Sequence, residues 1–206
     1  MNMTTDPPTP TIIWKTEITD GLEGLSVGFG RIIVLTGQCE LICLDPGDGS
    51  TTWRSGERDL YTSSNIAVWS DGQKFRVWSP WNFDLWFEPA VSTDVHFLPI
   101  WEQPHPGPCD IEEFRSWKLL EPDPSLDSEE VSYEYDETLF EPGAEPSTYM
   151  EHLLVFEPET RRAVFSLFWK GGYSQFHPPW RISPNECILG TSNSEIIKVR
   201  FPLPAD

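Results

Sequence analysis

A chain of 206 residues is long enough to bury a sizeable core without disulfides or bound metals. Its net charge of −19 opposes binding to nucleic acid or anionic membranes, because both need Lys and Arg to neutralise phosphates. The 10 Trp and 12 Phe favour strands over helices, while 20 Pro and 14 Gly divide the chain into short elements. We therefore expect an all-β protein.

The first ten residues are polar and lack the basic and apolar regions of a signal peptide. No apolar run approaches the roughly 18 residues that a membrane-spanning helix needs. We expect residues 1–10 to form a disordered tail, no membrane association and a cytoplasmic location. The cysteines are then reduced thiols in or near the core; they are Cys39, Cys43, Cys109 and Cys187.

Three hairpins follow in chain order. Residues 30–45 read as strand, short turn and strand, and residues 186–200 read the same way near the other end. Between them, the turn signal Asp71-Gly72 joins a strand at Ile66–Trp69 to one at Lys74–Trp78. Phe83–Glu88 is expected to be the outer strand of that sheet.

A partial repeat supports this pattern. Leu41–Pro46 matches Leu153–Pro158 position by position, and each stretch is followed by a turn and a strand. These strands carry an aromatic residue, Trp53 or Phe165, at the same distance from the matched segment. Internal repeats of this kind are typical of propellers and related repeat folds.

The segment Asp45-Pro-Gly-Asp-Gly49-Ser-Thr-Thr-Trp53 resembles the quinoprotein-type (PQQ-like) or WD-like β-propeller repeat, whose blades end in Asp, three residues, Gly, three residues and Trp. Glu157 to Phe165 fits loosely, and 39 residues, close to one blade, separate Trp14 from Trp53. We expect Asp45 to cap the turn and Gly49 to supply a positive φ. The aromatic side chains would pack between neighbouring blades. The structural residues are therefore Trp14, Asp45, Gly49, Trp53 and Phe165.

The chain ends suggest how the sheets would close. Thr11–Lys15 is a single strand that belongs to no hairpin. After the hairpin within Cys187–Phe201 no further strand follows, so the last blade lacks its fourth strand. Pairing the two would complete one blade and remove open edges. We expect a small β-propeller of four or five blades, forming a single domain over residues 11–206. A β-sandwich or an irregular barrel is the alternative.

An acidic, Pro-rich insertion at residues 102–149 interrupts the strand rhythm. From Glu121 to Glu145 there are ten acidic residues and no Lys or Arg, which indicates a mobile surface loop. Aromatic side chains interrupt the carboxylates, so the segment also fits a recognition site for a basic partner. The candidate partner-binding residues are Glu129, Glu130, Tyr133, Tyr135, Asp136, Glu137 and Phe140.

Catalytic motifs are weak. Gly24–Gly28 has the Gly-x-Ser-x-Gly pattern of serine hydrolases but precedes a strand, where that motif needs a helix. Gly28-Phe-Gly30 lacks the third glycine of a dinucleotide site, and Asp45–Ser50 has glycines where a calcium loop needs oxygen ligands. No histidine pairs with another His or Cys at metal-ligand spacing. We assign no catalytic, metal-binding or cofactor-binding residue.

The resemblance to quinoproteins does not imply their cofactor. The enzymes of that family have many more blades, a calcium-bound quinone and an adjacent cysteine pair, which this chain lacks. Fold does not determine function in any case. We expect no cofactor.

Three functions remain open. The first is a non-catalytic protein-interaction module whose acidic loop binds a protein partner, for which the charge suggests a basic one. The second is an inhibitor or immunity-type protein that neutralises a basic toxin such as a nuclease. The third is a hydrolase or lyase that uses the central funnel of the propeller.

Overall fold

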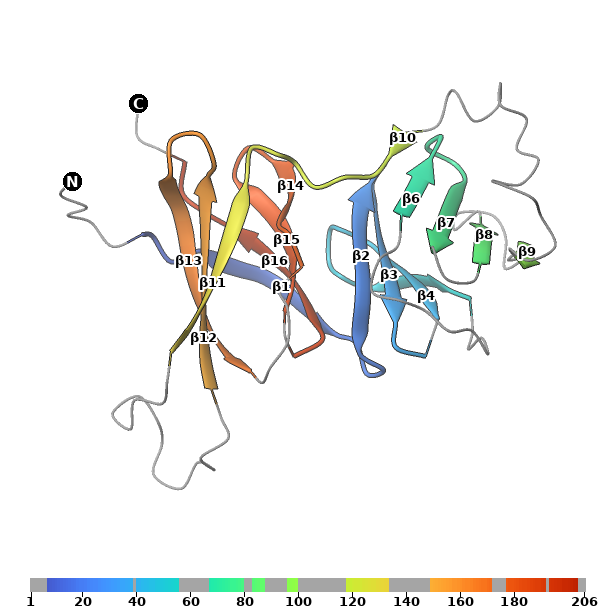
Figure 1. Cartoon of the computed structure of the whole chain (residues 1–206), viewed down its shortest axis with the longest axis horizontal. Coiled ribbons are helices and arrows are strands. Elements are labelled where there is room, and N and C mark those ends of the chain that lie inside the picture. Colours follow the sequence, from blue (N-terminus) through green and yellow to red (C-terminus); the bar gives the residue numbers. More distant parts are fainter. Residues whose placement is uncertain are drawn as a thin grey trace. The chain divides into compact units, whose positions relative to one another are not determined.

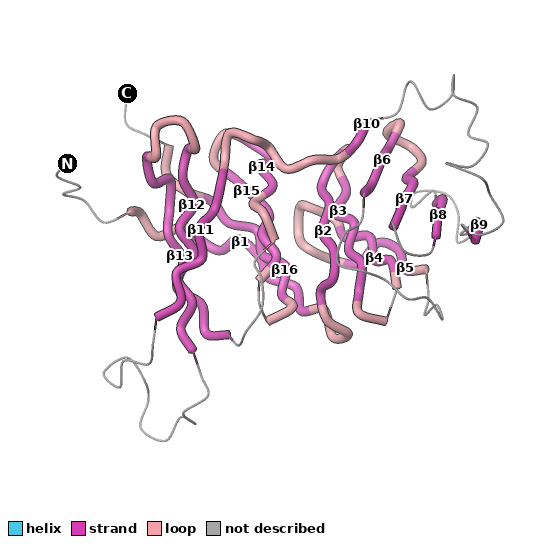
Figure 2. Tube along the Cα trace, viewed as in Figure 1, coloured by secondary structure: helices cyan, strands magenta, loops and turns pink. Residues whose placement is uncertain are grey.

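The computed structural model describes residues 7–38, 40–55, 67–79, 83–87, 96–99, 118–133, 149–171, 177–191 and 193–203. These residues form strands and connecting turns, arranged in several small antiparallel sheets (Figures 1 and 2). Within this part of the chain no helix is long and apolar enough to cross a membrane. The all-β prediction is confirmed for the described residues.

The chain divides into two compact units, of which one spans Ile18–Glu121. We call it the central unit, and it holds two sheets. The first has the order β2-β3-β4-β5 and contains β2 (Leu22–Gly28), β3 (Arg31–Thr36), β4 (Leu41–Leu44) and β5 (Thr51–Arg54). The second has the order β10-β6-β7-β8-β9 and contains β6 (Ala67–Ser70), β7 (Phe75–Ser79), β8 (Phe83–Phe87), β9 (His96–Pro99) and β10 (Lys118–Leu119).

The other unit combines both ends of the chain, Met1–Glu17 with Pro122–Asp206. We call it the terminal unit. One sheet has the order β11-β12-β13 and contains β11 (Asp127–Tyr133), β12 (Tyr149–Glu157) and β13 (Arg162–Gly171). The other has the order β1-β16-β15-β14 and contains β1 (Thr11–Glu17), β14 (Trp180–Ser183), β15 (Glu186–Gly190) and β16 (Glu195–Arg200). Whether both units form one domain stays a prediction.

Each unit has its own core between its two sheets. In the central unit this core joins β3, β4 and β5 to β6 and β7 and consists of Ile33, Leu35, Leu41, Cys43, Trp53, Val68, Phe75 and Val77. In the terminal unit it joins β12 and β13 to β15 and β16, and Phe165 stacks there on Phe201 with ring centroids 5.2 Å apart. Burial of these aliphatic and aromatic side chains is the main stabilising contribution in both units.

Two hairpins repeat the same backbone geometry. In the first, Trp53 on β5 pairs with Cys43 on β4, and the register shifts at the next residue. In the second, Phe165 on β13 pairs with Val155 on β12, and the register shifts at the equivalent place. Each outer strand therefore carries one extra residue, a β-bulge, immediately before its aromatic residue.

A third copy of this hairpin is divided between the two ends of the chain. Strand β1 pairs antiparallel with β16, which is the pairing expected between Thr11–Lys15 and the C-terminal hairpin. Trp14 lies opposite Lys198, and the register shifts between Ile12 and Trp14, again just before the aromatic residue. Trp14 thus holds the place of Trp53 and Phe165, although its side chain is only partly buried.

The turns of the two continuous hairpins also correspond. The Gly49 N–H donates to Asp45 O at 2.8 Å, and the Gly47 N–H donates to Asp45 Oδ1 at 2.6 Å. Gly49 has a φ of 75°. In the second hairpin the Arg161 N–H donates to Glu157 O at 2.8 Å, and Arg161 adopts a φ of 54°. A non-glycine residue in that left-handed conformation costs roughly 1–2 kcal/mol. Because Arg161 stands where the first copy has Gly49, the second copy lacks the glycine that marks the turn in the sequence.

Three stretches differ from their expected loops. One is the two-residue strand β10, which lies within the insertion expected at 102–149 and pairs with β6. Residues 7–10 belong to the expected disordered tail, yet the Ser166 N–H donates to Pro8 O at 3.1 Å and Pro10 is buried. Within the expected loop at 102–149, Asp127–Tyr133 forms β11 and Leu126 belongs to the core. The loop prediction is wrong for this stretch, because an edge strand tolerates a high density of charge.

We predict that removing the buried aromatic residue of either continuous hairpin lowers the free energy of unfolding by about 3–5 kcal/mol, the usual cost of a large cavity. The variants are Trp53→Ala, where the side chain is 8% exposed, and Phe165→Ala, where it is 0% exposed. Trp14→Ala is the matched control and should cost less. Denaturant unfolding measures the free energy of unfolding of all three variants. Equal losses would contradict the assignment of Trp53 and Phe165, but not Trp14, to the buried core.

We also predict that a chain lacking residues 1–17 is destabilised, because β16 loses β1, one of its two partner strands. Amide hydrogen exchange should then accelerate along β16. Lys15→Met is the control, since it keeps β1 and removes only the ion pair between the half-exposed Lys15 and Glu195, worth about 1 kcal/mol or less. Unchanged exchange in β16 after the truncation would show that β1 does not protect this strand.

Candidate functional site

The candidate partner-binding residues fall partly on one strand. Glu129, Glu130 and Tyr133 lie on β11, whose register places Glu129 opposite Leu154 and Glu130 opposite Leu153. The remaining candidates lie outside the described residues; they are Tyr135, Asp136, Glu137 and Phe140. The structure therefore brings the first part of the predicted segment onto a sheet edge and leaves the second part untested.

Strand β11 is the edge of its sheet. Because β13 carries the aromatic residue of the repeated hairpin, β11 holds the position that β3 and β15 hold in their sheets. Those strands have a further neighbour, β2 or β14, whereas no described strand pairs with the free side of β11. The backbone groups along that side can accept an added strand.

Glu129 is held by a contact that the sequence did not predict. Its carboxylate pairs with the Arg161 guanidinium from the turn between β12 and β13. The same guanidinium lies 3.9 Å from the centroid of the Phe156 ring, a cation–π contact. Both side chains of the ion pair are about half exposed, so the pair orients Glu129 without removing it from solvent.

Several of the described cations form ion pairs within the protein. Six of them form ion pairs with carboxylates; these are Lys15, Arg54, Arg161, Arg162, Lys198 and Arg200. Arg181 differs, because no carboxylate among the described residues lies within ion-pair distance of it.

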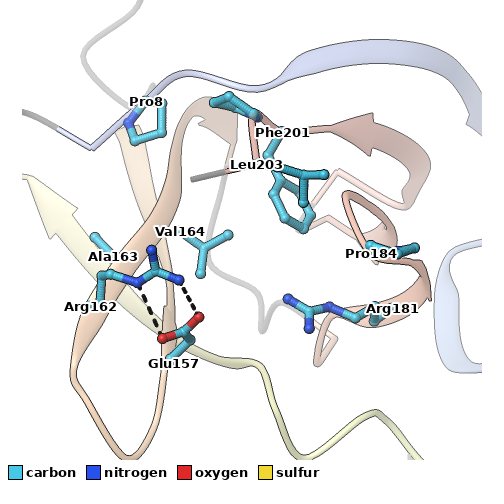
Figure 3. A pocket seen from close by; sticks show the side chains of 10 residues that line it. Pro8, Glu157, Arg162, Ala163, Val164, Arg181, Pro184, Phe201 and Leu203 are labelled. Carbon is cyan, nitrogen blue, oxygen red and sulfur yellow. Dashed lines mark hydrogen bonds and ion pairs between the residues drawn. The ribbon is translucent and has the colours of Figure 1, made fainter. Parts of the chain in front are cut away.

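A pocket of about 380 Å³ lies within the terminal unit, at the end that carries the turns after β12 and β14 (Figure 3). Most of its lining is apolar, with Val164 from β13 and Phe201 and Leu203 after β16. Arg162 donates to both oxygens of Glu157, with Nε···Oε2 at 3.2 Å and Nη2···Oε1 at 2.5 Å. These hydrogen bonds hold the pKa of Glu157 below its ordinary value, so the carboxylate stays ionised.

Arg181 reaches the pocket from β14, and its guanidinium points into the cavity (Figure 3). Its Nη1 donates to Ser125 Oγ at 3.1 Å, and its Cζ lies 5.9 Å from the Phe201 ring centroid. Its buried Nε has no hydrogen-bond partner among the described residues. No sequence motif marked this residue, because the pocket forms from segments that are distant in the chain.

Two residues with catalytic chemistry have structural surroundings in the described part of the chain. Ser26, the serine of the Gly-x-Ser-x-Gly pattern, is 3% exposed within β2, which leads through a turn into β3. The ring of His152 stacks on Phe168 at a centroid distance of 4.4 Å, and burial lowers its pKa. Over the described part of the chain, no three His, Cys, Asp or Glu side chains form a possible metal site.

The sequence matches no family model and no curated protein. Three solved structures resemble the chain weakly. They are the WD40 domain of SCAP from fission yeast (11% identity, TM-score 0.23), BamB from Moraxella catarrhalis (7%, 0.23) and the β-propeller domain of Myceliophteria thermophila Cps50, or Swd1 (10%, 0.22). The matches cover 86%, 91% and 93% of this chain, but only 48%, 75% and 54% of the three others. The chain thus spans about half the length of the SCAP and Swd1 domains, and these scores assign it neither a blade number nor a partner.

We predict that Cys43 and Cys187 resist a thiol reagent in the native protein at mildly alkaline pH. Both side chains are 0% exposed, and burial raises the pKa of both thiols, that of Cys187 to about 12. Labelling followed by peptide mass mapping tests this, with the guanidinium-unfolded chain as the control. Labelling of either residue at the unfolded rate would contradict the core assignment.

Proposed function

We propose that this chain is a non-catalytic protein-interaction module whose scaffold is propeller-like. Its site is the edge of β11, and its partner supplies an extended segment that carries Lys or Arg. The observation that carries the proposal is an acidic strand, Asp127–Tyr133, at the edge of a sheet with three described strands, where the other sheets have four or five.

Strand addition supplies both affinity and selectivity at such an edge. Main-chain hydrogen bonds to β11 would extend the sheet, as in other β-augmentation complexes. The carboxylates of Asp127 and Glu129, both exposed, would then lie beside the basic side chains of the added strand. Opposite charges on neighbouring strands stabilise the pairing by about 0.2–1 kcal/mol each.

The same charges disfavour a second copy of this chain as the partner. Two β11 strands placed edge to edge would bring Asp127 and Glu129 against like charges, which is destabilising. Charged edge strands are a common protection against self-association. The edge therefore favours basic strands over its own sequence, and this selectivity would equally serve an inhibitor of a basic toxin.

The scaffold and compartment in this proposal also rest on particular contacts. The hairpin divided between β1 and β16 supports a propeller of four or five blades that closes through its terminal strand. The shared bulge and turn geometry supports kinship with the quinoprotein-type repeat. The buried thiols of Cys43 and Cys187 are free, which supports a reducing compartment such as the cytoplasm.

We predict that an octapeptide of alternating Lys and Val binds the protein and slows amide exchange along β11. The double variant Asp127→Asn/Glu129→Gln should bind it about 1.4- to five-fold more weakly per carboxylate, as expected for exposed pairs of ~0.2–1 kcal/mol. Added salt should weaken binding to the unmodified chain more than to this variant. Fluorescence anisotropy and hydrogen exchange measure both effects.

Two controls separate the β11 edge from general charge attraction. Glu121→Gln/Glu159→Gln removes the same charge at exposed positions outside β11 and should leave binding nearly unchanged. A peptide of alternating Glu and Val tests backbone pairing without favourable charge and should not bind. Equal losses in both double variants, or protection of strands other than β11, would refute the proposed site.

A further inference from the structure

We propose that the pocket around Arg181 is a second binding site, which takes a carboxylate joined to a compact apolar group. This inference goes beyond the proposed function, because the pocket carries a positive group whereas the β11 edge is acidic. It follows from three features of the pocket, which are its charge balance, its apolar wall and the donors of Arg181.

The charged side chains that line the pocket are two arginines and one glutamate, so one positive charge is in excess. The bidentate hydrogen bonds between Arg162 and Glu157 join a positive and a negative group into a neutral pair. Arg181 then adds one positive charge to the lining. It contributes to lowering the pKa of both Glu157 and Asp123, so its field reaches these carboxylates without an ion pair to either. A bound anion would complete the charge balance of the pocket.

The apolar wall is rigid where it faces Arg181. Phe201 is 3% exposed, stacks on Phe165 and donates its backbone N–H to Asn185 O at 2.9 Å. Its ring lies within cation–π distance of the Arg181 guanidinium. Leu203, by contrast, is 55% exposed at the mouth of the pocket. Burying an apolar group between these side chains would remove exposed apolar surface from water.

The donors of Arg181 suit a carboxylate. One hydrogen bond to Ser125 fixes the guanidinium, which points into the cavity and leaves its second terminal nitrogen, Nη2, with no hydrogen-bond partner among the described residues (Figure 3). A planar guanidinium binds a planar carboxylate with two parallel hydrogen bonds. The guanidinium of Arg181 lies beside the ring of Phe201. A matching ligand therefore has its carboxylate at one end and an apolar group directly attached to it.

Size and overall charge exclude a polyanion. A volume of about 380 Å³ is at the lower end of the range for small-ligand pockets. The net charge of −19 repels extended polyphosphates, whereas a single carboxylate can be compensated by one arginine. The ligand chemistry is therefore a monocarboxylate on an apolar body, supplied either by a small acid or by the last residue of a peptide.

The test compares 4-phenylbutanoate with 4-phenylbutanol by isothermal titration of the whole chain. The acid should bind at least about tenfold more tightly than the alcohol, because the carboxylate forms two charge-assisted hydrogen bonds with the guanidinium and a hydroxyl forms at most one without the opposite charge. Arg181→Met should abolish this preference while keeping an apolar stem at the site. Arg181→Lys should retain part of it, and this variant keeps the test valid if the methionine variant fails to fold.

A substitution at the pocket mouth provides a matched control. Leu203→Glu places a like charge beside the bound carboxylate and should weaken binding of the acid, whereas Leu203→Gln should not. Both changes are at an exposed position, and thermal melting checks the fold of each variant. A tetrapeptide ending in Phe, with a free or an amidated terminus, then distinguishes a peptide source from a small acid.

Either source supports the proposal if the free carboxylate is required. Stronger binding of the peptide acid than of 4-phenylbutanoate would assign the ligand as a chain terminus, and the reverse would assign a small acid. Equal binding of acid and alcohol would overturn the proposal. So would a folded Arg181→Met variant that keeps the preference. None of these results bears on the β11 edge, whose test uses basic peptides and different residues.

Discussion

The pairing of β1 with β16 is the contact on which the terminal unit depends. It is the longest-range strand pairing in the described structure, because it joins residues 11–17 to residues 195–200. Strand β16 carries Ile196, Ile197 and Val199, all fully buried. An unpaired β16 would leave the backbone beside these side chains open to solvent or to another chain. The N-terminal strand therefore completes a sheet that the C-terminal hairpin cannot complete alone.

The same pairing contains the β-bulge that defines the repeated hairpin. The conserved feature of the three hairpins is the position of a bulge, one residue before a large aromatic side chain on the outer strand. A bulge increases the local twist of a strand and redirects the side chain that follows it. In the two continuous hairpins the redirected side chain, Trp53 or Phe165, enters the core. The geometry persists even where Arg161 replaces glycine in the turn.

The binding properties follow from exceptions to the general pattern of the described residues. Six cations there form ion pairs with carboxylates, and the other three sheets have four or five strands. Strand β11 is acidic and lacks a described neighbour on one side, whereas Arg181 is a cation without a carboxylate partner. The two sites differ in charge and lie on different elements of the terminal unit. One chain can therefore select a basic segment at one place and a carboxylate at another.

Local sequence determined the strands and turns, because alternation, glycine and aspartate act over a few residues. The hairpins and the turn at Asp45–Gly49 could be predicted from these signals. The pairing of the chain ends could be predicted only from the repeat, because the first strand and the last hairpin each lack the strands that would complete a blade. Residues 127–133 were misread, since high charge indicates a loop in the sequence but is tolerated in an edge strand. Only the tertiary structure brought Arg181, Arg162 and Phe201 around one pocket, because each comes from a different strand or connection. Sequence spacing carries no information on such distances, which depend on how the two sheets pack.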